Sequence, residues 1–405
     1  MSKIIFIGGI WAKQEEDWII SNSKGAIQSA ANIFQSNIIE GFDSNLSKPI
    51  TIVSSIFVGS FPKRFRKIVI KSNLFNHSSH YGHQDYQVGF LNLPIIKNIS
   101  KVNNIKKTLN TIINDKDDYY IVGYSMTYSI VKSLLYAKQI NNKVFTCLFV
   151  PDLPEYMNLS KSNIFIETIK KRNRKLMYKD IKNIDSFVVL TKHMYGRLGV
   201  KKPYIVVEGV SHNDFQKEKT IERGSEEIIL YSGSLNIQYG IKEMVDAMSF
   251  IPNKNIRLYI CGGGAEEKYI KEKMINDPRI VYLGLLSNEE CKIIQSKASL
   301  LINPRNSKEE YTSFSFPSKI LEYMSSGTPV LMTKLPGIPD DYYDYAYIID
   351  DESPEGIANA IVKTLSLPAK ERDLKAKSAK SFVLKEKSSF AQTKRIIDFL
   401  DKSSC

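Results

Sequence analysis

The sequence predicts an α/β protein made of two doubly wound domains, each with a parallel sheet covered by helices on both faces. Three observations predict this fold class. Short apolar runs of strand length alternate with helical patterns along the chain. The alternation pauses once, in a polar segment near residue 220. The chain has 405 residues, which is enough for two separate hydrophobic cores.

In the first half, the predicted strands are near-continuous apolar runs, which is typical of parallel strands buried on both faces. They are KIIFIGG, ITIVSSIF, KIVIK, YYIVGYSM, KVFTCLFV, SFVVLT and PYIVVEG. We assign residues 1–210 to this first domain. The polar stretch SHNDFQKEKTIERGSEE, residues 211–227, is the expected linker.

In the second half, residues 228–385, the alternation is cleaner. The predicted strands are EIILYSGSL, IRLYICGGG, IVYLG, SLLINPR, TPVLMT and AYIID, with helices such as IKEMVDAMSFI, AEEKYIKEKMI and NEECKIIQSKA between them. Ser287 followed by Glu290 predicts a capping box, and Ser353 before Pro354 predicts another helix start. Residues 386–405 are expected to form a helix that packs back toward the first domain. Two such domains joined by one linker leave a cleft at the carboxyl ends of their strands, where ligands bind in this kind of fold.

The stretch SFPSKILEYMSSGTPVL, Ser315 to Leu331, combines a strand exit, a loop and a helix. The helix is predicted to begin at Pro317 and to end at Gly327. Its free amides and dipole favour an anion, so the segment Ser315, Phe316 and Ser318 is a candidate phosphate site. Lys319 and Glu322 are three residues apart and share a helix face. They either bind a ligand or form an ordinary exposed ion pair.

The segment FPSKILEYMSSGTPV resembles the donor-site signature of retaining GT-B glycosyltransferases of the large family 4. YSGSL…YGI, ICGGG, VYLGLLSNEE and LLINPR follow in the family's order. The first half is similar to exopolysaccharide and capsule members through IIFIGGI, SAANIFQSNIIEGF and VPDLPEYM. The resemblance implies the GT-B fold, two Rossmann-like domains facing each other across a cleft, with a nucleotide sugar as substrate and no metal or other cofactor.

By this resemblance, Glu322 binds the ribose hydroxyls and the helix N-terminus binds the diphosphate. The strand ends line the donor, and Gly284 with Leu285 line its base; the other donor-lining residues are Gly233, Ser234 and Gly262. Two features depart from the family. Phe314 stands where a second glutamate is common, and SGSLNIQYG lacks the usual Arg and Lys. The phosphate charge is then met by Lys319, Arg305 or helix amides, unless Arg305 instead pairs with Glu309 or Glu310.

In the first domain, Gly8 and Gly9 end the first strand and allow a backbone to approach an acceptor or a diphosphate closely. Asp152 is the candidate polar group on the acceptor side and the tentative catalytic residue, with a loop-capping role as the alternative. His77, His80 and His83 lie in a polar segment that we interpret as a surface loop, with acceptor contacts or a metal as alternatives.

The net charge of +13 is uneven, since residues 1–210 hold 29 Lys and Arg against 15 Asp and Glu, or +14, which leaves −1 for the rest. Two basic clusters account for much of this; they are Lys63, Arg64, Arg66 and Lys67, and Lys170, Lys171, Arg172, Arg174 and Lys175. Either they are solvated surface or they contact an anionic membrane leaflet. No nucleic-acid-binding module accompanies them. Four scattered cysteines, no signal peptide and no apolar stretch of spanning length indicate a cytoplasmic protein, soluble or peripheral at the inner face of the membrane.

The resemblance implies a retaining glycosyltransferase that moves a sugar from a UDP-sugar to a cell-surface polysaccharide acceptor, and a basic first domain suits an acceptor that is lipid-linked. Three alternatives stay open. They are an inverting transferase with Asp152 as general base, a sugar-nucleotide epimerase of the same fold, and a non-catalytic partner subunit.

Overall fold

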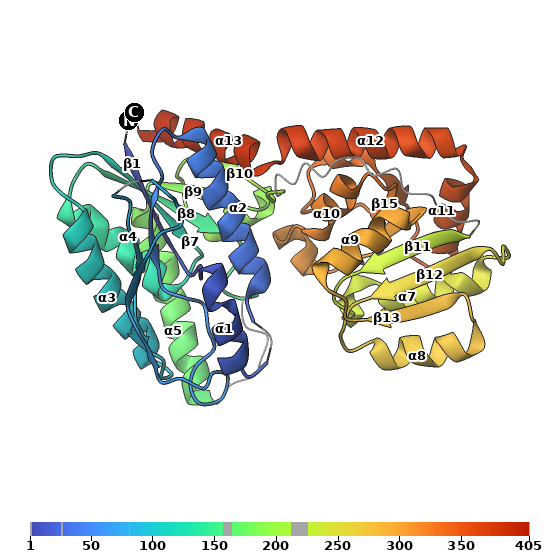
Figure 1. The fold of residues 1–405 in the computed structure, drawn as a ribbon, viewed down its shortest axis with the longest axis horizontal. Helices are drawn as coiled ribbons and strands as arrows, with labels where there is room; N and C mark the ends of the chain where they lie inside the picture. Colours follow the sequence, from blue (N-terminus) through green and yellow to red (C-terminus); the bar gives the residue numbers. More distant parts are fainter. Residues whose placement is uncertain (1, 26, 81, 157–163, 212–225, 405) are drawn as a thin grey trace. The chain divides into compact units, whose positions relative to one another are not determined.

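Strands and helices alternate to build two parallel sheets, one in each of two units of the chain (Figure 1). In this computed structural model the N-terminal unit comprises Met1–Val210 together with Ser389–Cys405, and the C-terminal unit comprises Ser211–Ser388. The structure describes residues 2–25, 27–80, 82–156, 164–211 and 226–404. Most of the expected linker, 211–227, therefore lies outside the described residues.

The sheet of the N-terminal unit has the strand order β10-β9-β8-β7-β1-β2-β5-β4, and only β4 runs antiparallel to its neighbour. Its strands are β1 (Lys3–Gly8), β2 (Thr51–Ser54), β4 (Asn73–Phe75), β5 (Asp85–Gln87), β7 (Tyr119–Tyr124), β8 (Val144–Val150), β9 (Ser186–Val189) and β10 (Tyr204–Val206). Two further short strands, β3 (Val69–Ile70) and β6 (Phe90–Leu91), form a separate antiparallel ribbon.

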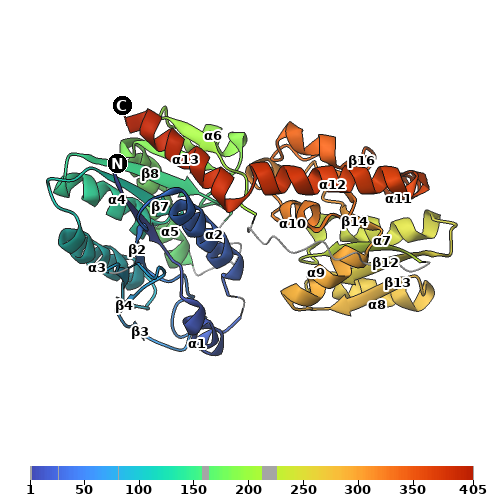
Figure 2. The same cartoon turned by 45° about the horizontal axis from the view of Figure 1, so that its top comes forward.

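Helices cover both faces of this sheet because its apolar runs are buried on both sides. They are α1 (Glu16–Asn22), α2 (Ser29–Asn45), α3 (Ile96–Ile112), α4 (Tyr128–Ile140), α5 (Ile164–Asp180), α6 (Lys192–Leu198) and α13 (Ser389–Ser404), with the 3-10 turns η1 (Lys13–Glu15) and η2 (Ile181–Asn183). Phe6 of β1 packs in one core cluster with Phe42 of α2 and Ile396 of α13. The last helix lies beside α2 in both views (Figures 1 and 2). Gly41 permits this approach, since a Cβ there would lie 2.3 Å from the Ser389 carbonyl oxygen.

The C-terminal unit has an entirely parallel sheet of order β13-β12-β11-β14-β15-β16. Its strands are β11 (Glu227–Ser232), β12 (Ile256–Cys261), β13 (Ile280–Gly284), β14 (Leu300–Asn303), β15 (Val330–Thr333) and β16 (Tyr347–Ile349). One face packs on α7 (Ile241–Ala247), α8 (Glu267–Asn276) and α11 (Pro354–Ser366). The other packs on α9 (Asn288–Lys297), α10 (Lys319–Ser326) and α12 (Ala369–Glu386). Short 3-10 turns are η3 (Ile237–Tyr239), η4 (Met248–Phe250), η5 (Glu310–Phe314) and η6 (Asp340–Tyr345).

Most predicted elements are present, and the differences have local causes. Ser287 and Glu290 form the expected capping box, and the Ser353 side chain caps α11 as expected. The prediction that α10 begins at Pro317 was wrong by two residues, because the Pro317 carbonyl closes a tight turn with the Ile320 amide before the helix proper. The strands β4, β5 and β6 were missed, since they are short and lack an apolar run. Among the described residues, no helix has the length and apolar character needed to cross a membrane.

Candidate donor site at the carboxyl ends of the C-terminal sheet

Helix α10 holds Glu322 in a polar network that reaches the neighbouring helix α9. Lys319 Nζ donates to Glu322 Oε2 at 2.7 Å, and Gln295 Nε2 of α9 donates to Glu322 Oε1 at 2.6 Å. The side chains of Lys319 and Glu322 are each 33% exposed. The expected ion pair is therefore real, but half of the Glu322 carboxylate is also bound by a buried amide from a second helix. A solvated surface pair would not have this second partner.

The network continues from Glu322 to the end of β11. Gln295 Nε2 also donates to Ser232 Oγ at 3.1 Å. The Ser232 amide donates to Tyr323 Oη at 2.7 Å, and Tyr323 Oη donates to the Ser232 carbonyl at 3.1 Å. Burial raises the pKa of Tyr323, so its hydroxyl keeps the proton that it donates. Glu322 is thereby fixed relative to the carboxyl end of β11, which is where ligands bind in doubly wound sheets.

Glycines bring the ends of β11, β12 and β13 into close contact. The Gly233 amide donates to the Cys261 carbonyl at 3.0 Å, and the Gly262 amide donates to the Gly284 carbonyl at 2.8 Å. Gly262 has φ 141°, and a Cβ there would lie 1.8 Å from the Gly233 carbonyl oxygen. Only glycine fits such an approach. The three strand ends that the sequence assigns to the donor are thus one continuous backbone rim.

Leu285 follows this rim and is 82% exposed, although it is apolar. Its side chain lies over Gly263, where a Cβ would be 3.4 Å from Leu285 Cδ2. Gly284, with φ 70°, turns the chain just before it. Ser234, on the neighbouring loop, is also exposed. An exposed leucine on a glycine loop offers an apolar surface for a flat ring, which is the role that the resemblance assigns to it.

Arg305 follows β14 and stacks on Tyr239, with its guanidinium carbon 4.3 Å from the ring centroid. Tyr239 in turn lies beside Tyr311, whose hydroxyl donates to the Gln238 carbonyl at 3.1 Å. Within the described part of the chain, Arg305 makes no ion pair with Glu309 or Glu310, so that alternative is wrong. Its charge is held by stacking and is open to an anion.

The loop before α10 is divided between core and site. Phe316 is 7% exposed and packs against Tyr342, so its side chain belongs to the core and only its backbone is available to a ligand. Ser318 is exposed, while Phe314 is half-buried. The Ser315 hydroxyl is buried and forms no hydrogen bond within the described structure. Because a buried hydroxyl usually has a partner, this unsatisfied group is consistent with a ligand contact.

In the N-terminal unit, the space beside the two glycines at the end of β1 is filled by protein. The Gly9 amide donates to Gln35 Oε1 at 2.9 Å, and a Cβ on Gly9 would lie 2.3 Å from Phe57. A Cβ on Gly8 would meet Gln35 Oε1 at the same 2.3 Å. Gln35 and Phe57 thus occupy the space that the two glycines leave open. An acceptor could contact these glycines only through backbone atoms that Gln35 and Phe57 do not cover.

Asp152 follows β8, at the same carboxyl edge as Gly8 and Gly9. Tyr124 lies nearby, at the end of β7. Burial raises the pKa of Tyr124, and the negative charge of Asp152 raises it further. The surrounding protein raises the pKa of Asp152 through desolvation, although the residue as a whole is exposed to solvent, which limits this effect. Ser125, beside Tyr124, has the strained φ of 146°. The edge therefore carries a carboxyl group of altered basicity next to a strained turn.

Both basic clusters lie on the surface of the N-terminal unit. Lys63, Arg64, Arg66 and Lys67 are all exposed, in the turn before β3. The second cluster lies on α5, beside a hollow of about 600 Å³ lined by Arg172, Lys175 and Leu176 of that helix and by Leu198 at the end of α6. All residues that line this hollow belong to the N-terminal unit, so we do not assign the nucleotide to it.

Sequence reasoning missed several residues of the donor site. Gln295 and Ser232 are buried polar residues that support Glu322, and Tyr239 supports Arg305. The available signal for Gln295 was a lone amide on the apolar side of an amphipathic helix. Ser232 and Tyr239 lie within the quoted segments YSGSL and YGI, but the sequence does not say which side chains they contact, because their partners come from distant segments.

Comparisons with known proteins bear on the fold and on the family of the C-terminal unit. Residues 212–381 match the model of the family described as "Glycosyl transferases group 1". No curated protein matches the chain. Among solved structures, sucrose-phosphate synthase from Thermosynechococcus elongatus is 16% identical with a TM-score of 0.63, covering 99% of this chain and 98% of that one.

Two further structures have similar scores. The Anabaena protein HepE in complex with UDP is 12% identical with a TM-score of 0.64, covering 99% of this chain and 100% of that one. The lipopolysaccharide outer core galactosyltransferase WaaB is 14% identical with a TM-score of 0.61, covering 99% of each chain. At these identities the likeness shows the fold. The chain thus has the GT-B fold, and its residues 212–381 match the model of the glycosyl transferases group 1 family.

Proposed function

We propose that this protein is a retaining glycosyltransferase that takes a sugar from a UDP-sugar and transfers it to a saccharide acceptor of a cell-surface polysaccharide. One observation carries the proposal: Glu322 is held between Lys319 and Gln295 at the carboxyl end of β11. The family match over the C-terminal unit supports it. HepE has the same fold and was solved in complexes with UDP and with UDP-glucose, which also supports the proposal.

The proposed donor site uses the described geometry directly. The carboxylate of Glu322 accepts hydrogen bonds from the ribose hydroxyls, and Leu285 packs against the base. Arg305, Lys319 and the amides at the start of α10 neutralise the diphosphate. No protein nucleophile is needed in this scheme, because the leaving diphosphate takes the acceptor proton. The chain then contributes positioning and charge stabilisation, and no metal takes part in the transfer.

An inverting reaction is the second candidate, and the environment of Asp152 favours it. A carboxyl group whose pKa is raised by desolvation is a better general base than an ordinary surface aspartate. In the retaining scheme, Asp152 instead contacts the acceptor. The anomeric configuration of the product, read by NMR, decides between the two.

We further propose that the N-terminal unit contacts an anionic membrane surface, where a lipid-linked acceptor would reside. Apolar side chains are exposed next to the first basic cluster. Ile68, just before β3, is 44% exposed, and Val69, the first residue of β3, is 52% exposed. Leu91 of β6, which pairs with Val69, is 43% exposed. Basic and apolar groups together favour the interface of an anionic bilayer. Sedimentation with vesicles should show binding that requires anionic lipid and weakens with salt, and Arg64→Gln with Lys67→Gln should reduce it.

The proposed function is tested by screening nucleotide sugars for protection against thermal unfolding. A ligand at 100 times its dissociation constant stabilises the protein by roughly 2.7 kcal/mol, which a melting curve resolves. We expect UDP and at least one UDP-sugar to protect. If no nucleotide sugar binds, the chain is not a transferase. If one binds and is altered without any acceptor, the epimerase alternative is correct, and binding without turnover would indicate a non-catalytic subunit.

A further inference from the structure

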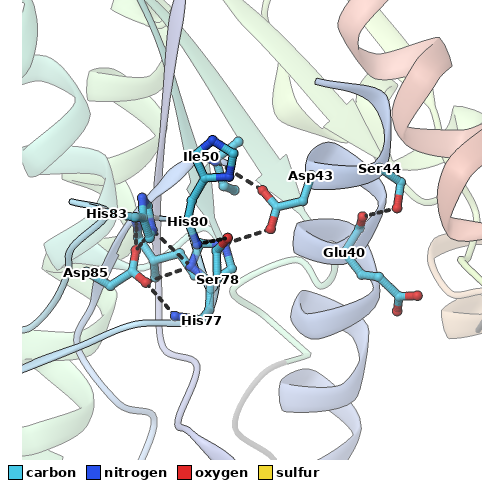
Figure 3. Close-up of polar contacts among 10 residues, drawn as sticks. Glu40, Asp43, Ser44, Ile50, His77, Ser78, His80, His83 and Asp85 are labelled. Carbon is cyan, nitrogen blue, oxygen red and sulfur yellow. Dashed lines mark hydrogen bonds and ion pairs between the residues drawn. The ribbon is translucent and has the colours of Figure 1, made fainter. Parts of the chain in front are cut away.

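The segment between β4 and β5 brings two histidines to one buried carboxylate (Figure 3). The sequence predicts a surface loop here, with acceptor contacts or a metal as alternatives. His80 is indeed exposed, but His77 and His83 are half-buried and Asp85, the first residue of β5, is fully buried. His77 Nδ1 lies 2.6 Å from Asp85 Oδ2, and His83 Nε2 lies 3.1 Å from Asp85 Oδ1.

The two ring nitrogens also face each other. His77 Nδ1 and His83 Nε2 are 3.3 Å apart, with the rings nearly perpendicular at 84°. Ligand atoms about 2.1 Å from a tetrahedral zinc ion stand about 3.4 Å from one another. The separation of the nitrogens and that of His83 from Asp85 are close to this value. The contact of His77 with Asp85, at 2.6 Å, must lengthen by about 0.8 Å when the ion binds. One nitrogen of each ring and one carboxylate oxygen therefore converge as a metal site requires.

Neighbouring groups hold two of these side chains in the orientation that a metal needs. Asp43 of α2 accepts from His77 Nε2 at 2.8 Å, which leaves Nδ1 as the ligand atom. A carboxylate behind a histidine is the usual outer partner of a zinc ligand. Asp85 accepts from the backbone amides of Ile52 and His77 at 2.8 and 2.9 Å. Asp43 itself accepts from the amide of Ile50 at 3.0 Å.

The cluster lies at the amino edge of the sheet, where β5 and β2 begin. The candidate acceptor groups, Gly8, Gly9 and Asp152, follow the carboxyl ends of β1 and β8 in the same sheet. In this fold, substrates bind at the carboxyl edge of the sheet. An ion at the opposite edge would therefore stabilise the structure and take no part in the reaction. It would tie the β4–β5 hairpin to the start of β2, and through Asp43 to the end of α2.

We propose that His77, His83 and Asp85 bind one divalent transition-metal ion, with zinc as the ion that their donor atoms suit best. Two imidazole nitrogens and a carboxylate oxygen make three ligands, and water completes the tetrahedron. The ion is structural and is independent of the glycosyl transfer proposed above. The competing explanation is a purely hydrogen-bonded cluster, in which protons occupy the contacts between the rings and Asp85.

The experiment is metal binding by the full chain, freed of metal by chelation. We expect one Zn²⁺ per chain by elemental analysis after reconstitution, a higher unfolding temperature with Zn²⁺, and no such shift with Mg²⁺. Co²⁺ should give the intense visible bands of a tetrahedral site with nitrogen and oxygen ligands. This readout needs no variant, so it stands even if a substitution prevents folding.

Variants then locate the ion. His83→Gln should abolish the Co²⁺ bands, and Asp43→Asn should weaken zinc binding roughly 10- to 100-fold. His80→Gln, an exposed histidine of the same loop, is the matched control and should change nothing. Absence of stoichiometric Zn²⁺ and of any shift in the wild-type chain would overturn the proposal in favour of the hydrogen-bonded cluster. A thiolate charge-transfer band that disappears in Cys291→Ser would equally overturn it, by placing the ion elsewhere.

Discussion

Replacing Glu322 with alanine separates a ligand-binding carboxylate from an ordinary surface ion pair. The structural cost follows from its contacts. The pair with Lys319 is one-third exposed and three residues apart, so it contributes about 0.5 kcal/mol or less. The hydrogen bond from Gln295 adds about 1 kcal/mol. The loss in the variant is smaller than this, because the Gln295 amide still donates to Ser232.

The expected loss of donor affinity is larger. Two ribose hydroxyls donating to one carboxylate contribute about 1.5 kcal/mol or more together, and up to about 4 kcal/mol. That corresponds to a dissociation constant roughly 10- to 1,000-fold weaker. The free energy of unfolding should fall by only about 1 kcal/mol, or about 2–4 °C in the melting temperature of a unit of this size.

The assay is calorimetric titration with UDP and with the UDP-sugar that protects best, alongside thermal unfolding of the free protein. Glu272→Ala is the matched control, because Glu272 forms a helical ion pair with Lys268 in the same unit at 3.8 Å. The control should leave donor affinity unchanged. If Glu322→Ala binds the donor as tightly as the wild type, the carboxylate is only a surface charge and the assignment of the site is wrong.

Three more predictions follow from named contacts. Arg305→Met should weaken UDP about tenfold or more but leave uridine unchanged, and Arg305→Lys should restore only part, since lysine lacks the guanidinium fork. Gly240→Ala should cost about 2 kcal/mol or more of unfolding free energy, because Gly240 has φ 71° and a Cβ there would lie 1.8 Å from the Pro304 carbonyl oxygen. Lys97→Met should stabilise the protein below pH 8, with a gain that declines between pH 8 and 10.5. Desolvation lowers the pKa of Lys97 from 10.5 to about 8, so in that interval the unfolded wild type binds the extra proton and wild-type stability rises with pH.

Each of these has a measurement and an outcome that contradicts it. If calorimetry shows that Arg305→Met weakens uridine and UDP binding equally, Arg305 does not contact the diphosphate. Gly196→Ala, where nothing lies within 4 Å of the added Cβ, should be nearly neutral in denaturant titrations, and a similar loss at both glycines would contradict the steric argument. For Lys97→Met, solvent reaching this half-buried side chain limits the slope to about 1 kcal/mol per pH unit or less. A gain that grows above pH 8 would show that the sign is wrong.

Both sheets and the candidate donor site can be located from the sequence alone. Buried parallel strands are apolar on both faces, so runs such as KIIFIGG and EIILYS are visible without any knowledge of their neighbours. The capping signals at Ser287 and Ser353 are equally local, since each acts within one turn of its own helix. Glu322 and the strand-end glycines were identified for the same reason, as parts of continuous motifs.

Tertiary structure decided which polar side chains meet. Gln295 and Glu322 are 27 residues apart, and Asp43 and His77 are 34 apart, so no local pattern predicts either contact. The strands β4 and β5 have three residues each and no apolar run, and their place at the sheet edge depends on pairing with β2 and with each other. That pairing buries Asp85 and brings His77 and His83 to it. A polar loop in the sequence thus becomes a cluster of ligand atoms, because the burial of a polar group is set by the whole sheet and not by its neighbours in the chain.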